Sequence, residues 1–174
     1  MSTILLTITD GVAVITLNRP DAGNALNPAL GEALSAELVR AVADDEVRVL
    51  IVTGAGEKIF CAGMDLKAFA AGENVAPVGR ALQQLATFPK PVIAAVNGHA
   101  LAGGFEGMMK CDLVVVAEQA RLGIPEVKRG LVAAGGGTRL PRRIPVQIAL
   151  ELGLTGEPIS AERAHQLGII NRVV

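Results

Sequence analysis

The chain has 174 residues, a formal net charge of −1 and 51% hydrophobic residues, which fits one globular domain and excludes a disordered protein. The charge is nearly balanced and no long basic run occurs, which argues against a nucleic-acid partner. Charged residues interrupt the apolar runs, so we expect no membrane span.

A hairpin and a helix are predicted at the start of the chain. Two β-rich runs at 4–9 and 12–17 flank an Asp-Gly pair, which is typical of a two-residue hairpin turn. Asn27 followed by proline is a typical helix cap and first helical residue. Leucines four residues apart then give one apolar face, so we expect an amphipathic helix over 28–44.

Strands and helices alternate along the rest of the chain. Continuous apolar runs, typical of strands covered on both faces, lie at 47–54, 91–98 and 112–117. The later part predicts a strand before Pro125, a glycine loop at 135–137, helices at 146–154 and 160–168, and a last strand in the final six residues. This alternation predicts an α/β fold.

Glycine-containing turns follow apolar strands at 53–58, 60–67 and 97–106. Glycine lets the backbone approach a ligand closely, and a glycine pair that opens a helix leaves N–H groups free. Two such N–H groups from separate loops could form an oxyanion hole. The alternative interpretation is that these glycines only end strands and start helices. The turns contain no Walker A or GxGxxG motif for nucleotide phosphates.

Two glutamates indicate a catalytic site more specifically than the glycines do. Glu106 lies in an apolar stretch, where an unpaired charge would be costly, and Glu126 follows Pro125 twenty residues later. We expect one short helix and one strand between them, which lets the chain bring them together. Two close carboxylates split their pKa values and provide one acid and one base for a water molecule. A salt-bridged Glu106 and a solvated Glu126 are the structural alternatives.

Metal binding is not predicted. Cys61 and Cys111 form no paired motif, and His99 and His165 are far apart in the sequence. The N-terminus has neither the basic region nor the cleavage site of a signal peptide. We therefore expect reduced thiols and a cytoplasmic location.

Five motifs together resemble the crotonase superfamily, the enoyl-CoA hydratase/isomerase family. They are LNRPDAGNALN (17–27), IFCAGMDLK (59–67), KPVIAAVNGHALAGGFEGMMKCDLVV (90–115), LGIPEVKRGLVAAGGGTRLPR (122–142) and ELGLTGEPISAERAHQLGIINRVV (151–174). Together, in this order and spacing, the five motifs cover essentially the whole chain. The resemblance implies one domain over 1–174, with the spiral of repeated ββα units of the crotonase-like (ClpP/crotonase) fold. It also implies an acyl-CoA thioester as ligand.

The resemblance assigns roles to four residues. In the family, main-chain N–H groups at the positions of Met64 and Gly103 hold the thioester oxygen as it becomes an enolate. The family's hydratases carry two glutamates at the positions of Glu106, which helps to activate water, and Glu126, which protonates the α-carbon. Retention of both favours an enoyl-CoA hydratase, which adds water to a trans-2-enoyl-CoA. The alternatives are double-bond isomerisation, CoA-ester hydrolysis, or a non-catalytic acyl-CoA binder or assembly subunit.

The resemblance also implies substrate-binding positions. They are the adenine-side residues Asn24, Ala25 and Leu26, the residues Asp65, Leu66 and Lys67 beside the pantetheine and phosphates, and Ala62. Lys67 could pair with a phosphate, or it could be an ordinary surface lysine. Coenzyme A is part of the substrate, so no separate cofactor and no metal are expected.

The sequence departs from the family pattern in three places. The stretch 65–91, which forms a wall of the acyl pocket, is shorter than in many relatives, so the preferred acyl-chain length stays open. Ala102 stands where the family commonly has the first of three glycines. Family members usually continue beyond Val174 into a helical section, so we expect a truncated chain or a naturally short relative. By the same resemblance the partner is another copy of the chain, in a trimer or hexamer.

Overall fold

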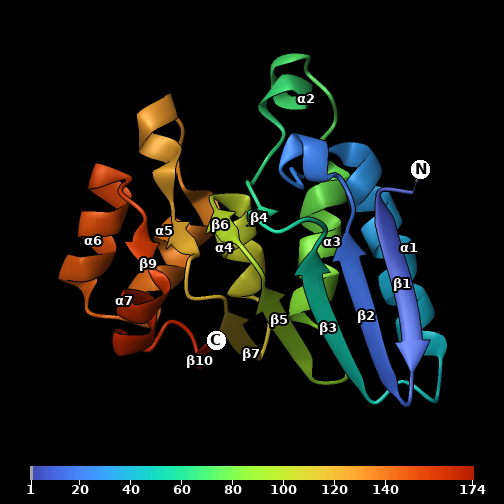
Figure 1. Cartoon of the computed structure of the whole chain (residues 1–174). Helices are drawn as coiled ribbons and strands as arrows, with labels where there is room; N and C mark the ends of the chain where they lie inside the picture. Colours follow the sequence, from blue (N-terminus) through green and yellow to red (C-terminus); the bar gives the residue numbers. More distant parts are fainter. Residues whose placement is uncertain (1) are drawn as a thin grey trace.

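The computed structural model describes residues 2–174 and contains two sheets (Figure 1). The strands of the large sheet are β1 (Ile4–Thr9), β2 (Val12–Leu17), β3 (Val49–Gly54), β5 (Val92–Val96), β7 (Leu113–Val116) and β10 (Arg172–Val173). The strands of the small sheet are β4 (Ile59–Cys61), β6 (His99–Leu101), β8 (Arg121–Gly123) and β9 (Ile159–Ser160). Neighbours run in the orders β1-β2-β3-β5-β7-β10 and β4-β6-β8-β9. Only the pairs β1–β2 and β8–β9 are antiparallel.

From β3 to β8, consecutive strands alternate between the two sheets. The neighbours β3, β5 and β7 of the large sheet are followed along the chain by the neighbours β4, β6 and β8 of the small sheet. Helices or 3-10 turns follow each of these strand pairs. This is the predicted spiral of ββα units, so the predicted fold is confirmed.

The helices are α1 (Pro28–Ala43), α2 (Leu66–Ala70), α3 (Ala76–Ala86), α4 (Gly103–Met108), α5 (Ala134–Arg139), α6 (Val146–Thr155) and α7 (Ala161–Gln166), with 3-10 turns η1 (Pro20–Ala22), η2 (Pro125–Arg129) and η3 (Leu140–Arg142). Most of the helices lie in two groups, with α2 and α4 outside them (Figure 1). Figure 1 shows α1 and α3 behind the large sheet, where they pack against each other, and α5 to α7 at the other side of the molecule. None of the helices within residues 2–174 has the length and apolar character needed to cross a membrane.

The predicted hairpin and first helix are confirmed. The strands β1 and β2 pair over their whole length, and the turn residues Asp10 and Gly11 have φ angles of 51° and 81°. The side chain of Asn27 accepts a hydrogen bond from the N–H of Leu30 at 2.9 Å and caps α1, whose first residue is Pro28.

The other predicted elements are mostly confirmed, most of them with shorter bounds. The apolar runs form β3, β5 and β7, and the two predicted late helices are α6 and α7. The predicted loop at 135–137 is wrong, because these glycines lie inside α5. Two strands, β7 and β8, separate Glu106 from Glu126, where one was expected. The short strands β4 and β6 lie within segments that we read as glycine turns.

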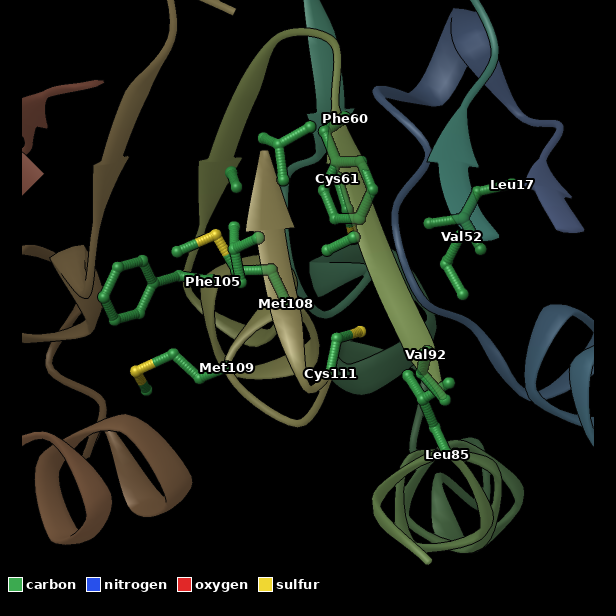
Figure 2. Close-up of a cluster of buried hydrophobic side chains, with 14 of the residues drawn as sticks. Leu17, Val52, Phe60, Cys61, Leu85, Val92, Phe105, Met108, Met109 and Cys111 are labelled. Carbon is green, nitrogen blue, oxygen red and sulfur yellow. The ribbon is translucent and has the colours of Figure 1, made fainter. Parts of the chain in front are cut away.

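A buried apolar cluster fixes the position of α4 (Figure 2). Phe105 and Met108 of α4 are fully buried, and they belong to the same core as Phe60 and Cys61 of β4. Burial of each large apolar side chain stabilises the fold by about 1.5–3 kcal/mol. The core therefore holds α4 firmly against the small sheet, and this short helix carries Glu106.

Candidate active site

A cavity of about 520 Å³ collects six of the predicted site residues. These six are Ala62, Met64, Leu66, Gly103, Glu106 and Glu126. The other lining residues carry no sequence signal that predicted them as site residues, and they are Phe69, Leu101, Ala102, Pro125, Arg129, Leu131, Val132 and Ala134. Most of the wall is apolar, as in sites for small organic ligands, and the two glutamates are its only acidic groups.

The main-chain N–H groups of Met64 and Gly103 are free and adjacent. The N–H of Leu26 donates to the carbonyl of Gly63 at 2.7 Å, and the N–H of Asp65 donates to the carbonyl of Leu26 at 2.9 Å. The N–H of Met64, between them, therefore points away from this pairing. A Cβ on Gly103 would lie 3.6 Å from the nitrogen of Met64. Within residues 2–174, neither N–H donates a main-chain hydrogen bond.

Ala102 makes the turn that starts α4. Its φ and ψ are 50° and −125°, a region that favours glycine, and such strain costs about 1–3 kcal/mol. The N–H of Ala102 donates to the carbonyl of Gly123, and its carbonyl accepts from the N–H of Glu106, both at 2.9 Å. This sharp turn lets the helix begin at Gly103 directly after β6, so the free N–H of Gly103 lies at the cavity wall.

The carboxylate of Glu106 is held by the start of α5. Its Oε1 accepts a hydrogen bond from the N–H of Gly136 at 2.5 Å. A Cβ on Gly135 would lie only 2.7 Å from Oε2 of Glu106, so the glycines allow this close approach. None of the ion pairs in residues 2–174 includes Glu106, so the salt-bridged alternative is not what the structure shows. The glycine triplet was the sequence signal for this contact, but we read it as a loop.

Glu126 has a different environment. It follows Pro125 in η2 and its side chain is half-buried, with a buried Oε2 that has no hydrogen-bond partner in the described residues. Burial raises the pKa of this carboxyl, the negative charge of Glu106 raises it further, and a main-chain hydrogen bond partly opposes both effects. One carboxylate is thus held by a donor while the other is biased toward its protonated form.

Two of the remaining predicted residues hold the cavity loops together. The fully buried amide of Asn24 donates to the carbonyls of Ala55 and Ile59, each at 2.9 Å, and its Oδ1 accepts from the N–H of Arg19. The carboxylate of Asp65 pairs with Arg19 at 3.0 Å and also accepts from the first N–H groups of α2. Both side chains therefore make their hydrogen bonds to other residues of the chain and hold its loops in place.

Three further predicted residues also lie outside the cavity lining. Ala25 is buried and its carbonyl accepts a hydrogen bond from Arg19 at 2.6 Å. Leu26 is buried next to Gly103. Lys67 is exposed on α2. The structure therefore brings together the thioester-side residues and leaves Lys67 on the surface.

The cysteines and histidines do not build a second site. Burial raises the pKa of both Cys61 and Cys111 to about 12, so these thiols stay protonated and weakly reactive. The described residues contain no group of three His, Cys, Asp or Glu side chains that could hold a metal ion.

The sequence profile described as enoyl-CoA hydratase/isomerase matches residues 7–174. The chain belongs to the enoyl-CoA hydratase/isomerase family. The predicted membership of the crotonase superfamily is confirmed.

Known members of the enoyl-CoA hydratase/isomerase family are close in sequence and structure. A carnitinyl-CoA dehydratase of Salmonella paratyphi A is 45% identical, over 97% of this chain and 67% of that protein. A carnitinyl-CoA dehydratase structure from Mycobacterium avium matches with a TM-score of 0.93 and 47% identity, over 100% of this chain and 70% of that one. An enoyl-CoA hydratase structure from Mycobacterium marinum matches with a TM-score of 0.92 and 53% identity, over 100% and 69%. The chain thus spans about two thirds of these relatives.

Proposed function

We propose that the chain is an enoyl-CoA hydratase, a hydro-lyase that adds water to a trans-2-enoyl-CoA and gives a 3-hydroxyacyl-CoA. One observation carries the proposal. A single apolar cavity is lined by Glu106, whose carboxylate accepts a main-chain hydrogen bond, by Glu126, whose pKa is raised by burial, and by Met64 and Gly103, whose N–H groups are free. The hydratase and dehydratase names of the relatives support a hydro-lyase acting on acyl-CoA.

The proposed reaction starts at the thioester. Its carbonyl oxygen accepts hydrogen bonds from the N–H groups of Met64 and Gly103, which stabilise the negative charge that develops there. Ala62 and Leu66 contact the thioester end, and Lys67 is the proposed partner of a CoA phosphate. The residues Asn24, Ala25, Leu26 and Asp65 hold the loop that contacts CoA. Coenzyme A is part of the substrate, and we propose no further cofactor.

Water then adds across the double bond. Glu106 accepts a proton from the water molecule while the water oxygen bonds to C3. At the same time the C2–C3 π electrons move toward the thioester, and the enolate forms. Glu126 then gives its proton to C2, and the carbonyl re-forms. One water molecule is added in total, and the two glutamates exchange roles in the reverse dehydration.

Hydration of crotonyl-CoA in H₂¹⁸O tests this proposal. We expect 3-hydroxybutyryl-CoA with the label on C3, and a loss of about 10²–10⁴-fold in kcat for Glu106→Gln and for Glu126→Gln. Glu118→Gln is the control, because Glu118 is exposed and lies outside the cavity lining. Full activity of Glu126→Gln would refute the acid assignment. Label in a free acid would show hydrolysis, a shifted double bond would show isomerisation, and binding without turnover would show a non-catalytic acyl-CoA binder.

Dehydration of carnitinyl-CoA is a second candidate. It is favoured by the names of relatives at 45% and 47% identity. The chemistry at C2 and C3 would be the same reaction in reverse, and the two candidates differ in the group attached to C4. The homo-oligomer expected from the family resemblance stays a prediction.

A further inference from the structure

The helix α4 carries Glu106 but has few directional contacts of its own. It has six residues, three of which are glycines, and no side chain caps its start. Glycine is a poor helix former, and a helix this short is marginal without outside contacts. Burial of Phe105 and Met108 holds α4 against the small sheet. Apolar burial is non-directional, so it does not by itself fix where a carboxylate points.

Two hydrogen bonds from the segment formed by α5 and η3 supply this direction. The N–H of Gly136, in α5, donates to Oε1 of Glu106 at 2.5 Å. Seven residues later, Nη2 of Arg143 donates to the carbonyl oxygen of Met109 at 2.7 Å. Met109 ends α4, three positions after Glu106. The same segment therefore contacts α4 at its carboxylate and again at its C-terminal end.

The hydrogen bond from Arg143 satisfies a buried acceptor. Carbonyl groups at the end of a helix have no donor within the helix. Met109 is fully buried (Figure 2). Within residues 2–174, Arg143 supplies the only hydrogen bond to the carbonyl oxygen of Met109. A buried acceptor without a donor is costly, so loss of this bond favours a shift of the end of α4.

The main chain around Arg143 is held in the core, although Arg143 itself is exposed. Its N–H donates to the carbonyl of Leu140 at 2.9 Å, and the N–H of Ile144 donates to the same carbonyl at 3.1 Å. Leu140 and Ile144 are both buried. In the part of the chain that the structure describes, Arg143 belongs to no ion pair. Its guanidinium is thus committed to α4 from a fixed starting point.

We propose that Arg143 is a positioning residue for the hydration: it fixes the end of α4 and so keeps the Glu106 carboxylate beside the N–H of Gly136. The inference rests on the proposed function, to which it adds a residue outside the cavity lining. A displacement of a catalytic group by about 1 Å is enough to slow a reaction strongly. Arg143 acts through Glu106 and contacts neither the substrate nor the water.

Arg143→Met tests this role, because it removes the donor and keeps a long, unbranched side chain. We expect kcat for crotonyl-CoA to fall about tenfold with little change in KM, since the thioester contacts are unaltered. Arg143→Lys keeps a donor at the end of the side chain and should recover most of the loss. Arg142→Met is the matched control, because Arg142 is exposed and its side chain makes no hydrogen bond or ion pair within residues 2–174. It should have the wild-type kcat.

A double-mutant cycle separates positioning from a general loss of stability. In Gly135→Ala, a Cβ at 2.7 Å from Oε2 of Glu106 already displaces the carboxylate. Because Arg143 acts through the same carboxylate, Arg143→Met should lower kcat less in this background than in wild type. Equal losses in the two backgrounds would overturn the proposal. A wild-type kcat for Arg143→Met, or no recovery in Arg143→Lys, would also overturn it.

Hydrogen exchange at the N–H of Gly136 tests the inference without catalysis. The bond to Glu106 protects this N–H, so Arg143→Met should speed its exchange about tenfold. The N–H of Leu50, which donates to the carbonyl of Pro91 at 2.9 Å, is the internal control and should exchange at an unchanged rate. If the wild type does not hydrate crotonyl-CoA, the hydratase proposal fails, and a selective increase at Gly136 still supports the role of Arg143. An unchanged rate at Gly136, or an equal increase at Leu50, contradicts that role.

Discussion

The N–H of Gly136 donates a hydrogen bond to Oε1 of Glu106 at 2.5 Å and so joins two segments that are thirty residues apart in the chain. Gly136 is the third residue of α5, where main-chain N–H groups have no acceptor within the helix. A carboxylate that accepts such a hydrogen bond is held in a fixed orientation. The Glu106 carboxylate is thus held by a neighbouring backbone N–H rather than by a cation.

The glycines of α5 allow a matched pair of mutations. In Gly135→Ala, the new Cβ would lie 2.7 Å from Oε2 of Glu106 and must displace the carboxylate. We expect kcat for crotonyl-CoA to fall by about 10²-fold, as is typical of a small misplacement of a catalytic group. In Gly137→Ala, the nearest atom to the new Cβ is the Cβ of Ala133 at 3.8 Å, an ordinary contact. Steady-state kinetics should show wild-type activity for this second variant.

The same pair gives a measurement of stability. Gly137→Ala should raise the free energy of unfolding by up to about 1 kcal/mol, because alanine favours a helix over glycine. Thermal unfolding measures this change. Equal kcat values for Gly135→Ala and Gly137→Ala would show that the position of the Glu106 carboxylate does not limit the reaction.

The raised pKa of Glu126 predicts a pH-dependent stability change. The folded protein binds this proton more tightly than the unfolded chain, so its contribution is complete below the ordinary value of 4.5 and is lost as pH rises through the raised pKa. Glu126→Gln should therefore be more stable than wild type at neutral pH, with an advantage that shrinks toward about pH 4. Urea unfolding at both pH values tests this, with Glu118→Gln as control. An advantage that grows in acid would contradict it.

The causes of this pKa shift can also be separated. Burial is the larger cause, and the charge of Glu106 is a smaller one. In Glu106→Gln the pKa of Glu126 should fall but stay above 4.5, because burial is unchanged. Titration of the ¹³C carboxyl signal of Glu126 by NMR measures this. A pKa that returns to 4.5 would mean that charge, and not burial, is the main cause.

Local sequence signals predicted the elements that depend on neighbouring residues. The hairpin turn at Asp10 and the cap at Asn27 are each set by a few adjacent residues. The three-residue strands β4 and β6 were missed, because segments this short have no hydrophobic period and look like the glycine turns around them.

The contacts that build the site are long-range, and local patterns do not contain them. The chemistry and spacing of the two glutamates were enough to predict that they share a site. The contact of Glu106 with Gly136 could not be predicted in this way, because it depends on how the whole chain folds. The buried role of Asn24 likewise depends on segments more than thirty residues away.

The strained turn at Ala102 predicts a stabilising mutation. Its φ of 50° favours glycine, so Ala102→Gly should raise the free energy of unfolding by about 1 kcal/mol. Ala36→Gly, on an exposed part of α1, should lower it by about 1 kcal/mol, because no strain is relieved there. Urea unfolding compares the two variants. A loss of stability in both would show that the Ala102 turn stores no strain.

Arg19 is a further positioning residue, because it joins the two segments that flank the free N–H of Met64. Its Nη1 donates to the carbonyl of Ala25 at 2.6 Å, and its Nη1 and Nη2 both lie 3.0 Å from Oδ2 of Asp65. A lysine has one nitrogen and cannot make this planar, forked set of bonds. Arg19→Lys should therefore loosen the Met64 loop and leave the net charge unchanged.

The expected effect of Arg19→Lys is on the reaction more than on binding. We expect kcat for crotonyl-CoA to fall about tenfold with a smaller change in KM, because a shifted N–H of Met64 stabilises the enolate less well. Arg40→Lys is the control, since Arg40 makes an exposed pair with Glu37 at 3.5 Å, and such pairs contribute little. If Arg19→Lys unfolds at a lower temperature but keeps the wild-type kcat, Arg19 stabilises the fold and does not position the oxyanion donor.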